Sequence, residues 1–151
     1  KGAAEYDTIA AIKQAVRIPV FANGDIDSPH KAKQVLQHTG ADGLLIGRAA
    51  QGKPWIFREI HHYLTHGETL KPPTTAEIRD ILLAHIRELH EFYGDFMGPR
   101  IARKHVAWYL NAHPGGEEFK RDFNQLEDPA RQVEALANHF EHLINVEEFA
   151  A

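Results

Sequence analysis

The sequence contains no cysteine and no long apolar run. The absence of cysteine excludes disulfides, thiolate metal sites and a thiol nucleophile within these 151 residues. A membrane-spanning helix needs about 20 consecutive apolar residues, and every apolar run in this chain is far shorter. We therefore expect no membrane partner, and the lack of cysteine fits a cytoplasmic location.

Histidine, by contrast, is abundant, with eleven residues. His62 and His66 are four positions apart, and His139 and His142 are three apart, which are spacings that place two imidazoles on one helix face. No carboxylate occupies a convincing third-ligand position, and the His-Glu-x-x-His motif is absent. The sequence therefore predicts no native metal site, and it contains no nucleophile elbow.

Charge is divided unevenly along the chain. The formal net charge is −4, and residues 67–151 alone carry nine lysines and arginines against fifteen aspartates and glutamates. Global charge therefore gives no indication of nucleic-acid binding. Any such surface must be local.

Residues 1–66 alternate helical and strand patterns. Helical periodicity at about 7–16, 29–38 and from 54 onward alternates with continuous apolar runs at 20–22 and 43–46. The alternation predicts right-handed parallel β-α-β connectivity, with strands covered on both faces. Ser28 is the expected N-cap of the middle helix, with Pro29 at its first position, and Gly40 is expected to end it.

A break at residues 66–73 predicts a domain boundary, which separates an α/β part (1–66) from a helical part (67–151). Thr74 and Glu77 match a capping box. Helical patterns follow at about 74–94, 99–111, 117–124 and from 129 onward, and a His113-Pro114-Gly115-Gly116 loop ends the second. Four helices with short loops predict a compact four-helix bundle.

Each apolar run of the α/β part ends in residues suited to an anion. Asn23, Gly24 and Asp25 follow the first run, and Gly47 and Arg48 follow the second. In parallel α/β folds, ligands bind beyond the carboxyl ends of the strands, and the last two strands of a (β/α)₈ barrel commonly hold a phosphate. Glycine lets backbone N–H groups approach phosphate, and arginine offers a fork of donors. A phosphate site is one interpretation, and a purely structural Asn-Gly turn is the other.

The helical part contains one basic stretch without intervening acids. Its cationic and imidazole side chains are Arg100, Arg103, Lys104 and His105, and Trp108 and Tyr109 follow. Such a surface could hold RNA phosphates and stack a nucleobase. The alternative is a solvated helix face with Trp108 and Tyr109 in the core.

Three motifs in this order resemble bacterial tRNA-dihydrouridine synthases, most closely the B subfamily. They are IPVFANGDI at 18–26, GLLIGRAAQGKPWIF at 43–57 and RKHVAWY at 103–109. The resemblance implies a flavoprotein that uses FMN, with NADPH as reductant, to reduce uridines in tRNA. It also implies a (β/α)₈ TIM barrel followed by a helical tRNA-binding domain, so the fold class is α/β plus all-α.

By the same resemblance, Asn23, Gly24, Asp25, Gly47 and Arg48 bind the phosphate and ribityl end of FMN. The four side chains Arg100, Arg103, Lys104 and His105 belong to the domain that meets tRNA.

The chain departs from the family in one large respect. The family's catalytic cysteine lies on an earlier barrel loop, and this sequence has none. A whole barrel takes about 250 residues, whereas residues 1–66 supply two strands. We therefore interpret the chain as the last two β/α units of the barrel plus the helical domain, with no catalytic residue and no activity on its own. Two alternatives remain: another FMN-dependent barrel oxidoreductase acting on a small molecule, and a non-catalytic RNA-binding module.

Overall fold

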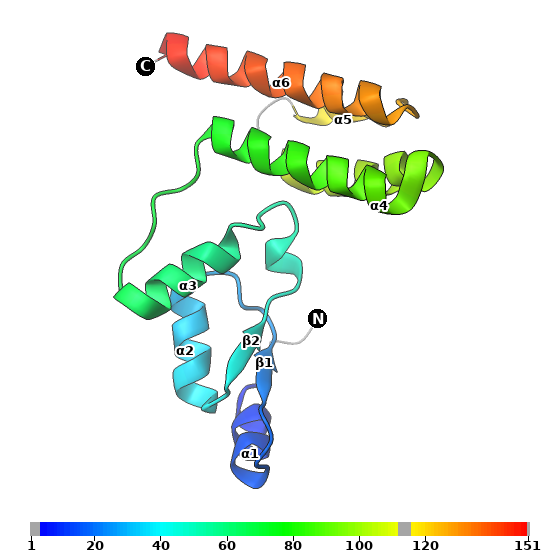
Figure 1. Cartoon of the computed structure of the whole chain (residues 1–151). Helices are drawn as coiled ribbons and strands as arrows, with labels where there is room; N and C mark the ends of the chain where they lie inside the picture. The colour runs from blue at the N-terminus through cyan, green and yellow to red at the C-terminus, as the bar shows by residue number, and fades with distance from the viewer. Residues whose placement is uncertain (1–3, 112–115, 151) are drawn as a thin grey trace. The chain divides into compact units, whose positions relative to one another are not determined.

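A computed structural model of the chain describes residues 4–111 and 116–150, without the side chains of residues 148 and 150. The predicted loop at 113–115 lies outside the described residues. The chain divides into two compact units, residues 1–71 and 72–151. Sequence patterns predict the boundary after residue 66, whereas in the structure residues 67–71 group with the first unit. Figure 1 shows that the segment joining the two units contains no helix or strand.

The first unit is a small parallel β-α-β structure with additional helices. Its elements are α1 (Asp7–Ala15), β1 (Phe21–Asn23), α2 (Pro29–Thr39), β2 (Gly43–Leu45), the 3₁₀ helix η1 (Arg48–Ala50) and α3 (Ile56–His66). β1 and β2 pair in parallel, with Phe21 opposite Gly43 and Asn23 opposite Leu45. The predicted parallel connection through α2 is therefore confirmed.

Both predicted ends of α2 are also confirmed. The Ser28 hydroxyl oxygen accepts a hydrogen bond from the Lys31 N–H at 3.3 Å, and Pro29 is the first helical residue. Gly40 follows the last turn with φ 64°, a left-handed conformation that favours glycine. Because both ends of α2 are capped, the connection between β1 and β2 has defined start and end points.

The two strands are covered on one face only, so the prediction of strands buried on both faces is wrong. Ala22 is fully buried in a cluster with α2 and α3 residues such as Val35 and Ile56. On the opposite face, the side chains of Phe21 and Leu45 are 57% and 58% exposed. The physical reason is that the helices of this unit pack against the face that carries Ala22.

The second unit is helical, with α4 (Thr75–Leu110), α5 (Gly116–Phe123) and α6 (Pro129–Ala150). The predicted capping box is present: the Thr74 hydroxyl accepts from the Glu77 N–H at 3.2 Å, and Glu77 Oε2 accepts from the Thr74 N–H at 2.8 Å. No helix among the described residues combines the length and apolar composition that a membrane crossing requires.

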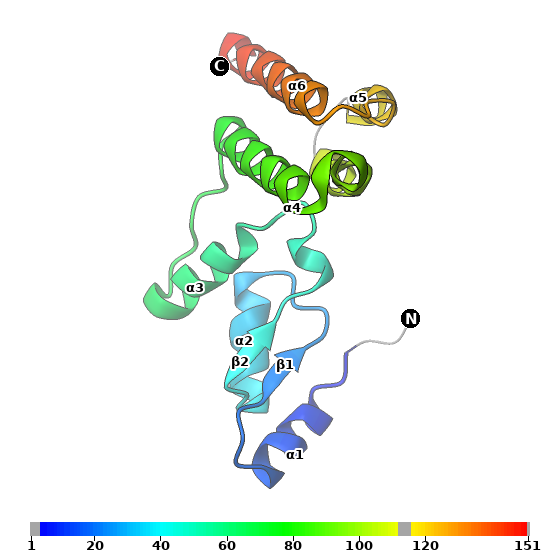
Figure 2. The ribbon, with the colours of Figure 1, turned by 45° about the vertical axis from the view of Figure 1, so that its right-hand side comes forward.

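The two helices predicted at 74–94 and 99–111 are two arms of α4 that meet at a break (Figure 2). Gly94 has φ 72° and ψ 175°, which is outside helical geometry. The arms approach closely after the turn, since a Cβ at Gly98 would lie 2.9 Å from the His90 Cα. The hairpin brings residues near 85 beside residues near 105.

The core of the second unit lies between α4, α5 and α6. Its buried apolar residues include Ile78, Leu82, Ile86, Ala102, Val106, Tyr109, Phe123, Leu136 and Phe140. The predicted inward positions Leu136 and Phe140 of α6 are confirmed.

Candidate functional site

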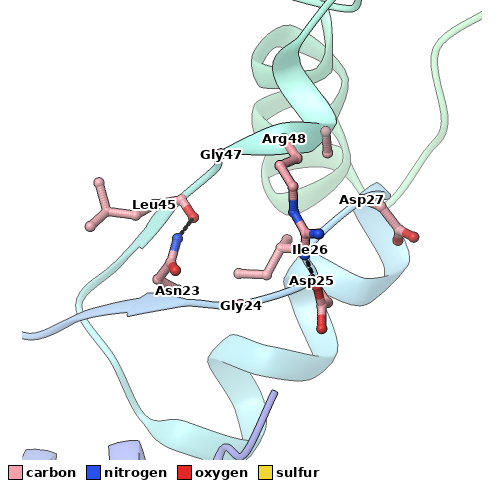
Figure 3. Close-up of a pocket in the computed structure, with 9 residues that line it drawn as sticks. Asn23, Gly24, Asp25, Ile26, Asp27, Leu45, Gly47 and Arg48 are labelled. Carbon is pink, nitrogen blue, oxygen red and sulfur yellow. Dashed lines mark hydrogen bonds and ion pairs between the residues drawn. The ribbon is translucent and has the colours of Figure 1, made fainter. Parts of the chain in front are cut away.

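A pocket of about 660 Å³ opens where β1 and β2 end (Figure 3). All five residues predicted at the strand ends line it. The complete lining is Asn23, Gly24, Asp25, Ile26, Asp27, Leu45, Gly47, Arg48 and Ala49. Sequence reasoning missed Asp27 as a lining residue, although its position directly after the turn was a signal.

Asn23 ties the two strand ends together. Its side-chain Nδ2 donates a hydrogen bond to the Leu45 carbonyl oxygen at 2.9 Å (Figure 3). Because Asn23 and Leu45 are register partners, this bond holds the two loops that follow them at a fixed separation. The side-chain oxygen Oδ1 is an acceptor by its chemistry.

The two glycines of the pocket differ in what surrounds them. Gly24 has φ 128°, its carbonyl oxygen accepts from the Tyr6 hydroxyl at 2.6 Å, and a Cβ there would lie 2.6 Å from the Ala4 Cβ. Protein packing therefore already requires glycine at this position. A Cβ at Gly47 would meet no atom within 4 Å, so the backbone at Gly47 is open to a ligand.

Arg48 supplies the positive charge of the pocket. It begins η1, and its Nη2 lies 2.7 Å from Asp25 Oδ1. The Arg48 side chain is 74% exposed, so its remaining donors face solvent. Asp25 adopts φ 44°, a left-handed conformation that non-glycine residues rarely take. Because Asp25 already pairs with Arg48, an anion that binds Arg48 must share the guanidinium with Asp25. Asp27 adds a second carboxylate to the pocket lining.

The four predicted residues of the basic stretch do not form one surface. Arg103 is half-buried, and its Nη2 donates to the Leu126 carbonyl oxygen at 3.2 Å. Arg100 donates to the Phe96 carbonyl oxygen at 2.5 Å, and its guanidinium lies 3.6 Å from Glu127. Both arginines are thus engaged within their own unit.

Lys104 and His105 face a different set of rings. The Lys104 ammonium is exposed and lies 5.1 Å from the centroid of the Trp108 ring. The His105 ring lies 4.9 Å from Trp108 and 4.9 Å from His85, centroid to centroid. Tyr109 is buried, which agrees with the alternative that placed it in the core, and Trp108 is half-buried.

Sequence reasoning placed His85 on the apolar stripe and missed it as a surface residue beside His105. Its Nδ1 is hydrogen-bonded to the Tyr109 hydroxyl at 3.3 Å. Burial lowers the pKa of His85; burial, His85 and Lys104 together lower the pKa of His105. Burial raises the pKa of Tyr109 to about 12. Only the hairpin of α4 brings positions 85 and 105 together, and no local pattern signals it.

The other histidines that the structure describes show no arrangement suited to a metal. In the part of the chain that the structure describes, no three His, Asp or Glu side chains gather closely enough to hold one. The His62 and His66 rings stack at 4.5 Å, and His139 stacks on Phe119 at 4.0 Å.

Comparison with known proteins gives consistent matches. The family model described as dihydrouridine synthase (Dus) matches residues 1–145. The chain is 59% identical over 143 residues to tRNA-dihydrouridine synthase B of Vibrio vulnificus, which covers 95% of this chain and 44% of that protein. It is 61% identical over 142 residues to the protein of the same name from Pectobacterium carotovorum, with 94% and 44% covered. The chain spans less than half the length of these curated relatives.

Proposed function

The chain belongs to the dihydrouridine synthase family, and we propose that it forms the carboxyl-terminal portion of a tRNA-dihydrouridine synthase. Such an enzyme reduces uridines in tRNA to 5,6-dihydrouridine with FMN and NADPH, in the cytoplasm. In this proposal residues 1–66 are the last two β/α units of the FMN-binding TIM barrel. Residues 67–151 form the helical domain that meets tRNA. The carrying observation is the pocket at the ends of two parallel strands, with Arg48 at its rim.

Three features of the pocket suit the phosphate end of FMN. The exposed Arg48 guanidinium can offer two parallel N–H groups to phosphate oxygens. The open backbone at Gly47 allows close approach. Asn23 Oδ1 can accept a hydrogen bond from a ribityl hydroxyl, while Nδ2 keeps the strand ends together.

The residues of this chain bind and orient, and the reacting groups lie elsewhere. FMN, when bound, supplies the hydride chemistry that reduces the uridine double bond. Because the chain has no cysteine, the acid that the family uses must come from another part of the longer protein. We expect the 151-residue chain alone to be inactive.

For the RNA contact, the exposed Lys104 and the half-buried His105 are the strongest candidates of the basic stretch. Arg100 and Arg103 support this contact indirectly, because their hydrogen bonds hold the bend of α4 and the loop before α6 in place. The Arg100 guanidinium lies 3.6 Å from the Glu127 carboxylate, and this distance still allows it to turn toward a phosphate.

The test compares Arg48→Gln with Arg58→Gln in the longer enzyme. Arg58 is exposed on α3 and is outside the pocket lining. Losing a hydrogen bond to a charged group costs about 1.5–3 kcal/mol, so Arg48→Gln should weaken FMN binding about tenfold to a hundredfold. Flavin fluorescence measures the dissociation constant. Equal flavin affinity in both variants would contradict the phosphate assignment.

The same preparations distinguish the small-molecule alternative. Flavin reduced by NADPH should be reoxidised faster when tRNA is added, with dihydrouridine appearing in the RNA. Reoxidation that is indifferent to tRNA would favour an oxidoreductase acting on a small molecule.

A further inference from the structure

Four rings follow one another along the junction of the two arms of α4. The Tyr109 hydroxyl is hydrogen-bonded to His85, the His85 ring meets His105 at 4.9 Å and 79°, and the His105 ring meets Trp108 at 4.9 Å and 74°. The exposed Lys104 ammonium lies over Trp108. We name His85, Lys104, His105 and Trp108 the imidazole strip.

The strip is accessible, and its positive charge at neutral pH comes from Lys104. His85, His105 and Trp108 are half-buried, so each keeps an exposed portion. The two lowered histidine pKa values leave both imidazoles neutral at pH 7, and Lys104 is then the strip's cation. The cation–π contact with Trp108 restricts the Lys104 side chain.

The groups that act on the histidine pair all belong to α4. Glu88 opposes the lowering at His85, whereas Lys104 and the neighbouring imidazole add to it at His105. Tyr109 faces His85 as a neutral hydroxyl. Among the described residues of α5 and α6, none is a cause of either shift. An anion placed against the strip therefore acts on imidazoles whose protonation is opposed by burial and, at His105, also by His85 and Lys104.

We propose that the paired imidazoles of His85 and His105, together with Lys104, contact RNA phosphates and take up a proton when the RNA binds. The inference rests on the RNA contact proposed above. It adds His85 to the residues of that contact, and it adds the uptake of a proton when RNA binds. A phosphate beside the pair stabilises the protonated form by Coulomb attraction and by a charge-assisted hydrogen bond. Because the two rings are adjacent, one proton on the pair disfavours a second.

The sign of the pH dependence follows by linkage. The histidine pKa values lie below their ordinary value in the RNA-free protein and rise in the complex. The complex thus binds more protons than its separate components, so affinity increases as the pH falls through the range between the two pKa values. One proton taken up limits the change to about tenfold per pH unit, and partial uptake gives about threefold.

The test titrates the chain into a fluorescently labelled tRNA transcript between pH 5.5 and 8.0 at constant ionic strength. The wild type should bind about threefold to tenfold more tightly per pH unit below about pH 6.5. The double variant His85→Asn, His105→Asn should lose this slope. His142→Asn, at an exposed position of α6, is the matched control and should keep it.

A second measurement does not depend on how the double variant folds. The imidazole proton resonances of the wild type, followed by NMR against pH, should report higher pKa values for His85 and His105 with RNA than without it. The resonances of the exposed His142 should be the same with and without RNA at each pH. Unchanged pKa values for the pair would overturn the inference.

The outcomes separate the inference from the function beneath it. Salt-dependent RNA binding with the same pH slope in the wild type and the double variant would reject the imidazole strip but leave the RNA-binding role standing. Absence of RNA binding at every pH would reject both.

Discussion

At the scale of single residues, Gln132 is the polar centre of the helical unit. It is fully buried, its Oε1 accepts from His90 Nε2 at 2.9 Å, and its Nε2 donates to the carbonyl oxygens of Pro99 and Leu126 at 3.1 and 3.0 Å. One side chain thus joins both arms of α4, the loop before α6 and α6 itself. A buried polar group with every donor and acceptor satisfied fixes a single packing arrangement.

Gln132→Leu should therefore destabilise the chain although it adds apolar surface. The buried His90 donor loses its partner, which costs about 1–3 kcal/mol, and the bonds to the two carbonyl oxygens are lost as well. We expect the free energy of unfolding to fall by about 2–4 kcal/mol in urea titrations. Gln125→Leu, at an exposed position, is the control and should change it by less than about 0.5 kcal/mol.

Residue types at the candidate site could be predicted from sequence, but their pairings could not. Glycine, asparagine and arginine after an apolar run identify a strand end that suits an anion. The Asp25–Arg48 ion pair joins two loops, so it becomes visible only when the strands are in register. Arg103 on a basic helix face predicts exposure; in the structure it is half-buried because the Leu126 carbonyl oxygen lies within its reach.

At the scale of elements, local chemistry determined both ends of α2 and the start of α4. Ser28 and the Thr74–Glu77 capping box act within one turn of helix, and both were predictable for that reason. Coverage of the sheet could not be predicted from the strand patterns alone, because an apolar run indicates what could be buried and not what is available to bury it. Phe21 is the clearest example of that difference.

The break in α4 depends on the backbone of Gly94. Its φ of 72° and ψ of 175° belong to a region that is almost exclusive to glycine, and strain there costs about 1–3 kcal/mol. A Cβ would meet no atom within 4 Å, so Gly94→Ala should lower stability by that amount through conformation alone.

Differential scanning calorimetry of Gly94→Ala against Asp95→Ala measures this effect. Asp95 is an exposed neighbour in ordinary helical conformation, so its replacement should leave the melting temperature nearly unchanged. Equal melting temperatures for the two variants would mean that the turn adapts without strain.

At the scale of the whole molecule, the uncovered face of β1 and β2 governs behaviour in solution. Phe21 and Leu45 expose more than half of their surface, at diagonal positions of the two neighbouring strands. The sheet of the described residues has two strands, so each presents an outer edge without a strand partner. Such edges and apolar faces favour association between chains.

We expect the 151-residue chain to self-associate with increasing concentration, and Phe21→Lys with Leu45→Lys to shift it toward monomer. Sedimentation velocity between about 5 and 200 μM follows the change, a range in which weak interfaces of this kind respond to concentration. Phe57→Lys alters an equally exposed aromatic residue on α3 and should have little effect. A comparable shift in that control would exclude the sheet face as the cause.

The bond between Asn23 and Leu45 also has a consequence for how the protein is made. It spans 22 positions, and the Asp25–Arg48 pair spans 23, so both contacts close loops of modest length within the first unit. Closing such short loops loses little chain entropy, and domains fold as units, amino-terminal first, while the ribosome is still extending the chain. The pocket can therefore assemble in the nascent polypeptide without any contribution from α4, because all of its lining residues precede that helix in the chain.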